Sequence, residues 1–250
     1  MILRPAFAQN VPFLLCAIST RQGGVSGGSF GMNLSYSVGD DREAVAENRQ
    51  RFFRSLGIGL DALALQRQVH GVEVRCVDRP GTWADTDGLC TSASGVYLCV
   101  TIADCVPVFL VDPTVPAVGV VHAGWRGSAA RIAAKGVWTM VEKLGAKAST
   151  MVAYIGPSAG VCCYAVGPDV AAQFPASCVV RSNGEVRVDL KQANREQLLS
   201  AGLRDTAVSV DPACTICGTE LFHSHRRDGA RSGRMMGVLG IRDGSIGTPG

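Results

Sequence analysis

Short apolar runs bounded by glycine, proline or polar residues recur along the chain, and this pattern is typical of β-strands. We expect strands over residues 63–70, 72–77, 96–102, 106–111, 115–122, 151–155, 179–180, 186–188 and 235–239. Some neighbouring runs are joined by connections too short for a helical crossover, such as Asp112-Pro113-Thr114. The pattern therefore favours antiparallel or mixed pairing.

Four other segments have the apolar spacing or the end signals of helices. The expected helices run from Asp40 or Asp41 to Leu56, from Ser128 to Leu144, from Asp189 to about residues 201–202, and over 168–174. Strands outnumber helices, which predicts an α+β fold with a mixed or antiparallel β-sheet core and helices packed outside. No linker or repeat interrupts the sequence, so we expect a single domain over 1–250 with a loose, glycine-rich tail over 241–250.

Composition excludes several classes of protein. The chain has 250 residues, of which 47% are hydrophobic and 18% charged, so it can bury a core and does not have the composition of a disordered protein. Its 24 basic and 21 acidic side chains give a net charge of +3, spread along the sequence without a basic stripe. We therefore expect no nucleic-acid partner, and the sequence indicates no protein partner.

The apolar runs do not predict a membrane segment. The longest of them, residues 96–111, is interrupted by Asp104 and Pro107. The run 11–18 contains Pro12 and leads to no small-residue cleavage site, so we do not interpret it as a signal peptide. The ten cysteines are too dilute for a disulfide framework, so we interpret them as reduced thiols. We expect a cytoplasmic protein with no membrane partner.

Candidate chemistry gathers at the ends of the expected strands. His70 and His122 each end a strand, and Cys105 lies with Asp104 between two strongly apolar runs, where an unpaired carboxylate would be costly. His70, Cys105 and His122 are ligand types that suit zinc and would leave a fourth position open. A second interpretation makes Cys105 a nucleophile activated by His122. A third is that these are ordinary residues at strand ends, and the spacings of 35 and 17 residues leave all three open.

Arg49 falls on the apolar stripe of the first expected helix. A guanidinium in that position needs an anionic partner. The partner is either a carboxylate of the protein, with Asp87 and Asp104 as candidates, or a phosphate or carboxylate of a substrate.

Arg126 lies just before the expected helix start at Ser128, where backbone N–H groups favour an anion. The alternative is a surface arginine beside a capped helix. The polar run 223–229 is interpreted in the same two ways, as a solvated loop or as part of a pocket wall.

Cys214 and Cys217 form a C-x-x-C pair that resembles half of the zinc motif of nucleobase deaminases. The other half of that motif, H-x-E, does not occur in the sequence, and Ala213 interrupts the pattern. A four-cysteine zinc site would need a second spaced pair, whereas Cys162 and Cys163 are adjacent. We therefore interpret Cys214 and Cys217 as structural or incidental thiols.

A set of motifs spread over nearly the whole chain resembles one known family. In order, they are Gly23-Gly24-Val25-Ser26, Met32-Asn33-Leu34-Ser35, Val38-Gly39-Asp40-Asp41, Glu47-Asn48-Arg49, Gln68-Val69-His70-Gly71, Thr101-Ile102-Ala103-Asp104-Cys105-Val106-Pro107, His122-Ala123-Gly124-Trp125-Arg126-Gly127, Ile155-Gly156-Pro157, Arg226-Arg227-Asp228-Gly229 and Gly233-Arg234. Each is weak alone, but their combination, from about residue 21 to about residue 239, is similar to the YfiH-type family.

The resemblance implies a fold like that of YfiH proteins, which is similar to that of bacterial toxin deamidases with a Cys–His pair. The family was once described as laccase-like polyphenol oxidoreductases and is now regarded as purine nucleoside phosphorylases. It implies phosphorolysis of adenosine, inosine, guanosine and methylthioadenosine, together with deamination of adenosine. Purine nucleosides and phosphate are then the expected substrates.

The resemblance also implies which residues form the site. Its zinc ligands correspond to His70, Cys105 and His122. A Cys-His₂ site also suits copper, so copper is a second possible cofactor. The family now carries phosphorylase chemistry, and four histidines are too few for a multicopper oxidase, so a copper-dependent polyphenol oxidoreductase is the alternative rather than the main prediction.

The same comparison places Asn33, Ser35 and Arg49 against the substrate. Arg49 and Arg126 are suited to hold phosphate. Asp104 or Asp87 would move protons, with Asp87 also a candidate substrate contact.

One departure from the family is visible at residues 164–167. Members commonly carry Tyr-Glu-Val-Gly, and this chain has Tyr164-Ala165-Val166-Gly167. The alternative function, a thiol hydrolase or amidase using Cys105 and His122, gains weight if that glutamate contributes to the family's activity. The main prediction is a zinc-dependent purine nucleoside phosphorylase with adenosine deaminase activity.

Overall fold

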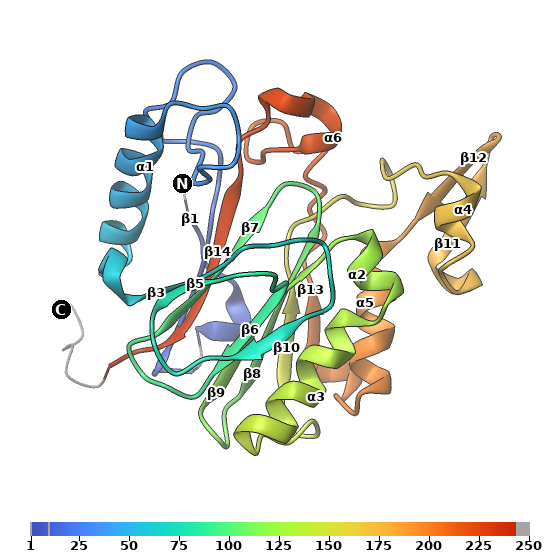
Figure 1. Ribbon diagram of the computed structural model, residues 1–250. Helices are drawn as coiled ribbons and strands as arrows, with labels where there is room; N and C mark the ends of the chain where they lie inside the picture. Colours follow the sequence, from blue (N-terminus) through green and yellow to red (C-terminus); the bar gives the residue numbers. More distant parts are fainter. Residues whose placement is uncertain (1, 10, 244–250) are drawn as a thin grey trace.

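Two six-stranded sheets form the centre of the molecule, and the computed structural model describes residues 2–9 and 11–243 (Figure 1). The first sheet has the strand order β1 (Ile2–Leu3), β2 (Leu14–Ser19), β14 (Met235–Ile241), β7 (Tyr97–Ile102), β3 (Leu63–Gln66) and β5 (Gly81–Trp83). The second sheet has the order β13 (Val208–Val210), β10 (Val152–Ile155), β8 (Val106–Asp112), β9 (Ala117–Ala123), β6 (Gly88–Thr91) and β4 (Val74–Cys76). Both sheets are mixed. In the first sheet β3 pairs in parallel with both β5 and β7, and in the second the edge strands β13 and β4 pair in parallel with their neighbours. The other pairs are antiparallel.

Helices cover the outer faces of the two sheets (Figure 1). Helix α1 (Arg42–Ser55) packs Phe52 and Phe53 on the first sheet, and α3 (Ile132–Leu144) and α5 (Leu190–Ser200) pack on the second. The short α2 (Trp125–Ala129) leads into α3, and α6 (His225–Asp228) lies at the top of Figure 1. The hairpin of β11 (Val179–Ser182) and β12 (Glu185–Val188) projects beside α4 (Pro168–Ala171).

The two sheets pack face to face. Apolar side chains from both fill the space between them, including Ile18, Val100, Phe109, Val120 and Leu239. The strands β8 and β9 are buried along their whole length because the first sheet lies on one side of them and helices lie on the other. Their continuous apolar sequences are the expected result of burial on both faces.

The predicted fold class is confirmed, because the chain is an α+β protein with mixed sheets and helices outside. Strands cover all nine of the predicted apolar runs at least in part. The sequence analysis missed β1, β2, β5, β6 and β13. The omission of β2 has a clear cause: its apolar run was considered only as a possible signal peptide, although all six of its residues are buried.

Two of the predicted helices have the expected ends. Asp41 caps α1 through bonds from the amides of Glu43 and Ala44, and Gly57 follows with a positive φ of 70°. Asp189 caps α5 by accepting a bond from the amide of Gln192.

The helix predicted over 128–144 is wrong at its start. Helix α2 begins at Trp125, and Arg131 adopts a φ of 64°, which separates α2 from α3. Ser128 therefore lies inside a short helix rather than at a cap. The helix predicted over 168–174 is reduced to α4.

The strand predicted over 63–70 is also too long, since β3 ends at Gln66 and His70 has a φ of 60°. The loose tail predicted over 241–250 is wrong at Ile241, which closes β14, and residues 244–250 lie outside the described residues. Within the described part of the chain, no helix is long and apolar enough to cross a membrane.

Candidate metal centre

The chain crosses from one sheet to the other at the candidate centre. Strand β7 belongs to the first sheet and β8 to the second, and Ala103, Asp104 and Cys105 join them. The turn is tight, and Asp104 adopts a φ of 83°, which is uncommon for a residue with a side chain. This crossing explains why a polar pair interrupts the most apolar part of the sequence.

Strand register brings the three predicted ligands together. Antiparallel pairing sets Pro107 opposite His122 on β9, so Cys105 at the start of β8 lies beside the end of β9. His70 follows β3 at the same edge. One ligand atom from each of His70, Cys105 and His122 lies within 4.8 Å of the others, and the two imidazole rings meet edge to face with centroids 4.9 Å apart.

Gly124 leaves room for this cluster. A Cβ atom at that position would lie 3.0 Å from Cδ2 of His70 and 3.2 Å from Sγ of Cys105. A side chain at this position would have to displace the His70 ring or the Cys105 sulfur by a few tenths of an ångström, so the glycine suits the close approach of the backbone to the cluster.

Asp87 supports the cluster from behind. Its carboxylate lies 2.8 Å from Nδ1 of His122 and accepts bonds of 2.8–3.1 Å from the backbone amides of Val69, His70 and Gly71. This contact holds a proton on Nδ1, so Nε2 is the nitrogen of His122 that would bind a metal after losing its own proton. Asp87 is fully buried, and its role as a substrate contact stays a prediction. Its contacts position the His122 ring and the backbone at 69–71.

The charges of Cys105 and His122 reinforce each other. Burial alone would raise the pKa of the Cys105 thiol, but the imidazoles of His122 and His70 outweigh it and hold that pKa at about 6. Burial would lower the pKa of His122, but the Cys105 thiolate and the Asp87 carboxylate raise it to about 9. A thiolate is the form of cysteine that binds metals and attacks electrophiles.

A pocket of about 310 Å³ opens beside this cluster. Besides His70, Cys105 and Asp104, its wall is formed by Ala103, Trp125, Arg126, Tyr164, Leu190, His225 and Arg226. Two of its walls pair an arginine with an aromatic ring: the guanidinium of Arg126 lies 4.4 Å from the Trp125 ring centroid, and that of Arg226 lies 4.7 Å from the Tyr164 centroid. The pocket therefore combines flat apolar surface with positive charge.

Asp104 lines the pocket, and its carboxylate also accepts hydrogen bonds from the segments around it. One of its carboxylate oxygens accepts a 2.7 Å bond from the Thr215 hydroxyl. The other accepts bonds from the Ser224 hydroxyl at 3.0 Å and from the Arg226 amide at 2.6 Å. These partners explain how a carboxylate that is only 6% exposed is tolerated here.

Asn33, Ser35 and Arg49 lie in a separate group near α1. The Asn33 side chain is fully buried and bonds to Ser35 and Asp40, while the Arg49 guanidinium donates to the Leu34 carbonyl at 2.8 Å. Arg49 also lies 4.6 Å from the Tyr36 ring centroid.

None of these three residues lines the pocket beside Cys105, and their role against a substrate stays a prediction. Neither Asp87 nor Asp104 pairs with Arg49 among the described ion pairs.

Sequence reasoning gave Arg226 and His225 no definite role. They lie in the run 223–229, for which a pocket wall was one of two interpretations, and the structure supports that one. The solvated-loop interpretation is wrong at His223, which is fully buried and whose pKa is lowered to about 4 by burial and by nearby arginines. Tyr164 was missed as a pocket residue, although it lies within the motif that carries the Ala165 departure.

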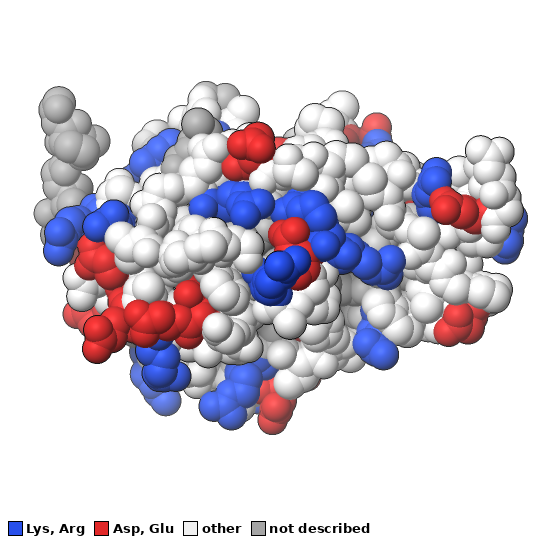
Figure 2. Space-filling view, turned by 90° about the horizontal axis from the view of Figure 1, so that it is seen from above, with Lys and Arg blue, Asp and Glu red and all other residues white. Residues whose placement is uncertain are grey.

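Lys and Arg side chains gather in a band on the upper face of the molecule (Figure 2). Helix α6, at the top of Figure 1, contains Arg226 and Arg227. Arg126 and Arg226 also bring positive charge to the pocket wall, which favours anionic ligands.

The fold and this site define a class of α+β proteins with a His–Cys–His cluster at the crossing between two sheets. Residues 15–242 match the family model described as "Multi-copper polyphenol oxidoreductase laccase". The chain belongs to this family, as the motifs implied.

Relatives of known name cover nearly the whole chain. Purine nucleoside phosphorylase of Deinococcus radiodurans is 43% identical over 92% of this chain and 91% of its own length. Purine nucleoside phosphorylase YlmD of Geobacillus stearothermophilus is 38% identical over 96% and 93%, and its crystal structure superimposes with a TM-score of 0.90 over 94% of each chain at 36% identity. Adenosine deaminase RL5, from an unknown prokaryotic organism, is 36% identical over 87% of this chain and 90% of its own length. The chain is an enzyme of this kind.

Proposed function

We propose that this protein is a zinc-dependent purine nucleoside phosphorylase that also deaminates adenosine. Phosphorolysis converts adenosine, inosine, guanosine or methylthioadenosine and phosphate into the free base and a ribose 1-phosphate. The observation that carries the proposal is a cluster of three metal-ligand side chains, two of which line one pocket together with two arginines. The names of the relatives support the same chemistry.

The residues fit a zinc ion. One thiolate and two imidazoles are ligands that zinc accepts, and three protein ligands are typical of a catalytic zinc site. Gly124 lets the backbone pass close to the His70 ring and the Cys105 sulfur, and Asp87 supports His122 as carboxylates support metal-bound histidines. Zinc held by His70, Cys105 and His122 would supply Lewis acidity at the pocket wall. Copper binds the same ligand types, so the metal content of the purified protein decides between them.

Arg126 and Arg226 are the groups that would bind phosphate. Both line the pocket, and both are exposed rather than tied to a carboxylate among the described ion pairs. A guanidinium binds phosphate through two parallel hydrogen bonds. Their stacking on Trp125 and Tyr164 limits the motion of both side chains, which keeps the donors in place.

The apolar part of the same wall would contact the purine. Trp125, Tyr164 and Leu190 supply flat or apolar surface next to the ligand cluster. A base held there lies beside both the candidate metal ligands and the arginines, which is the arrangement that phosphorolysis and deamination share.

Asp104 is the better candidate of the two carboxylates for moving a proton. It lines the pocket directly next to Cys105, whereas Asp87 lies fully buried behind His122. The hydroxyl and amide donors on Asp104 fix the position of its carboxylate at the pocket wall. In deamination, Asp104 would accept a proton from the water that replaces the amino group of adenosine, and ammonia would leave.

A second candidate function, a thiol hydrolase or amidase, has one observation in its favour. His122 contacts Cys105 on one side and Asp87 on the other. This is the order of a nucleophile, a base and a residue that orients the base. The nearby imidazole of His70 is not needed for such a triad, whereas a metal site uses it. This favours the metal site.

The test is the release of hypoxanthine from inosine, and of adenine from adenosine, with and without phosphate. We expect release only with phosphate, loss of turnover when a chelator removes zinc, and resistance of the zinc-loaded enzyme to iodoacetamide. Turnover by metal-free protein that iodoacetamide abolishes would favour the thiol hydrolase. No turnover by folded, zinc-loaded protein would overturn the assignment.

A further inference from the structure

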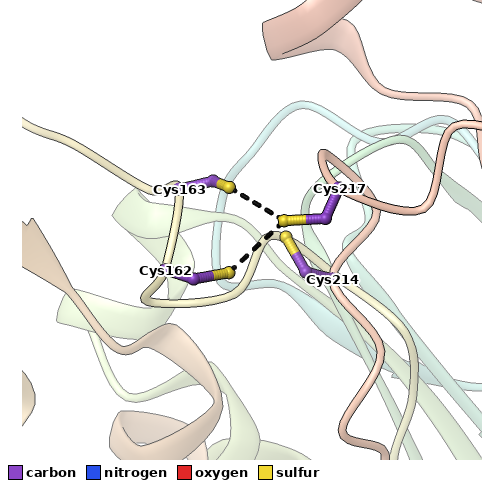
Figure 3. Close-up of side chains that lie close together, drawn as sticks. All are labelled: Cys162, Cys163, Cys214 and Cys217. Atoms are coloured by element: carbon purple, nitrogen blue, oxygen red, sulfur yellow. Dashed lines mark hydrogen bonds between the residues drawn. The ribbon is translucent and has the colours of Figure 1, made fainter.

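A second group of metal-ligand side chains lies outside the candidate centre. Its members, called here the four-cysteine cluster, are Cys162, Cys163, Cys214 and Cys217 (Figure 3). All four sulfur atoms lie within 4.8 Å of one another. The sequence analysis set a four-cysteine site aside because two of these residues are adjacent, but the turn at 161–163 directs both of their side chains toward Cys217 (Figure 3).

Strand pairing brings the two halves of the cluster together. Strand β10 pairs in parallel with β13, and the loops that follow these strands continue side by side through a bridge between Ser158 and Cys214. The Thr215 amide bonds to the Ser158 carbonyl at 3.0 Å. The backbone therefore holds the two pairs of thiols in position although about 50 residues separate them in sequence.

The backbone is also shaped around the sulfur atoms. The amide of Gly160 donates to Sγ of Cys214 at 3.2 Å, and the amides of Ile216 and Cys217 point at the same sulfur. A Cβ atom at Gly160 would lie 3.2 Å from Sγ of Cys162 and 3.1 Å from Cβ of Cys214. Amide donors of this kind stabilise thiolate sulfur, and they are satisfied here without water.

A buried cation balances the charge that four thiolates would bring. Lys191 on α5 is only 7% exposed, and its ammonium donates to the carbonyls of Asp211 and Ala213 at 2.6 and 2.7 Å. Both carbonyls belong to the loop that carries Cys214, and the lysine interacts electrostatically with Cys214 and Cys162. A divalent ion with four thiolates has a net charge of about −2, which a nearby ammonium partly offsets.

The spacing of the sulfurs suits one ion. Four ligands at about 2.3 Å from a tetrahedral zinc lie about 3.8 Å from one another, and the two sulfur contacts to Cys217 are 3.1 and 3.6 Å. We propose that the four-cysteine cluster binds a second zinc ion, with a structural role, in a closed site of four thiolates. Binding releases the thiol protons to solvent and involves no oxidation or reduction.

The ion would stabilise the loops that lie behind the pocket beside Cys105. Thr215, between the two cysteines of the C-x-x-C pair, donates to Asp104 next to Cys105. Tyr164 directly follows Cys163 and lines the pocket. The second site therefore supports the first through the chain and does not touch the substrate.

The test counts zinc per chain in the purified full-length protein by elemental mass spectrometry. We expect two zinc ions in the wild type, about one in Cys217→Ser, and two in the matched control Cys76→Ala, which changes a partly exposed thiol outside both clusters. We also expect Cys217→Ser to lower the melting temperature by roughly 5–10 °C, because the ion closes a long loop. Substitution with cobalt should give stronger visible absorption in the wild type, where a site of four thiolates contributes, than in Cys217→Ser, where mainly the one-thiolate site at Cys105 contributes.

Several results would overturn the proposal. One is a single zinc in the wild type that Cys217→Ser leaves in place. Another is a disulfide among the four cysteines, shown by mass spectrometry after alkylation under denaturing conditions, and a third is iron in place of zinc. If Cys217→Ser does not fold, titration of wild-type thiols with a mercurial replaces it: a second, separate release of zinc supports the proposal, and its absence contradicts it.

Discussion

The two sulfur-containing clusters of this molecule differ in the ways that separate a working metal site from a structural one. The centre at His70, Cys105 and His122 has mixed ligands, an incomplete set of three, and a pocket with arginines beside it. The four-cysteine cluster has a full set of identical ligands and lies in two loops behind that pocket. Catalytic zinc keeps an open position and structural zinc does not. The comparison shows that ligand number and surroundings, rather than the presence of cysteine, indicate what each site does.

Graded removal of metal should separate the two sites and has the largest expected effect. With increasing chelator, we expect the three-ligand centre to lose zinc first and turnover to disappear with it, while the melting temperature changes little. The four-thiolate site should lose zinc later, with the main drop in melting temperature, because more thiolates hold it. Zinc content, turnover and melting temperature measured on the same samples check this order. Loss of turnover only with the second ion would contradict it.

Asp87→Asn should weaken the three-ligand centre alone. The amide cannot accept the same bonds from residues 69–71 and the His122 ring, so we expect zinc affinity or turnover to fall roughly 10–100-fold. The matched control is Asp112→Asn, which changes another fully buried carboxylate with several bonds, at the far end of β8. The control should lower stability and leave zinc affinity unchanged. Equal effects of the two substitutions on zinc affinity would remove the positioning role of Asp87.

Arg126→Ala should weaken phosphate binding without changing the zinc content of either site. Loss of a guanidinium that binds phosphate should raise the KM for phosphate about tenfold and change kcat less. Arg181→Ala, on the projecting hairpin, removes an exposed arginine away from the pocket and is the control. Steady-state kinetics at varied phosphate measure the difference. An unchanged KM would assign phosphate to another group, with Arg226 next to be tested.

The pH dependence of alkylation should distinguish Cys105 from the buried thiols. In metal-free protein its pKa is lowered to about 6, so the thiolate forms above that pH and labelling should rise through a midpoint near 6. Burial raises the pKa of Cys178 to about 11, so this residue should stay unlabelled at neutral pH. Site-specific mass spectrometry after timed iodoacetamide treatment checks both. Zinc should protect Cys105, and a midpoint near that of an ordinary thiol, about 8.5, would contradict the description of this cluster.

Local patterns were enough to predict the fold class and much of the order of elements. The caps at Asp41 and Asp189 and the long apolar runs of β8 and β9 are encoded in neighbouring residues. The errors came from backbone conformations that tertiary contacts impose. Three amide bonds to Asp87 hold residues 69–71, so an alternating sequence that favours a strand forms a turn at His70 instead.

The three-ligand centre was predicted in part from residue chemistry and mainly from the family resemblance. Its supporting contacts were not: the partner of His122 depends on the register between β6 and β9, where Gly88 faces Val121. The four-cysteine cluster was dismissed on spacing along the chain. Its halves meet only because β10 and β13 pair in parallel, which no short segment of sequence shows.

The most direct test compares two variants that should each hold one zinc ion. Cys105→Ala removes a ligand of the three-ligand centre, and Cys217→Ser removes one from the four-cysteine cluster. With both proteins folded and their zinc content measured, phosphate-dependent release of hypoxanthine from inosine is recorded well below their melting temperatures. We predict that Cys105→Ala loses more than about 99% of turnover, whereas Cys217→Ser keeps most of it. Equal turnover in the two variants, or loss in Cys217→Ser alone, would contradict the account.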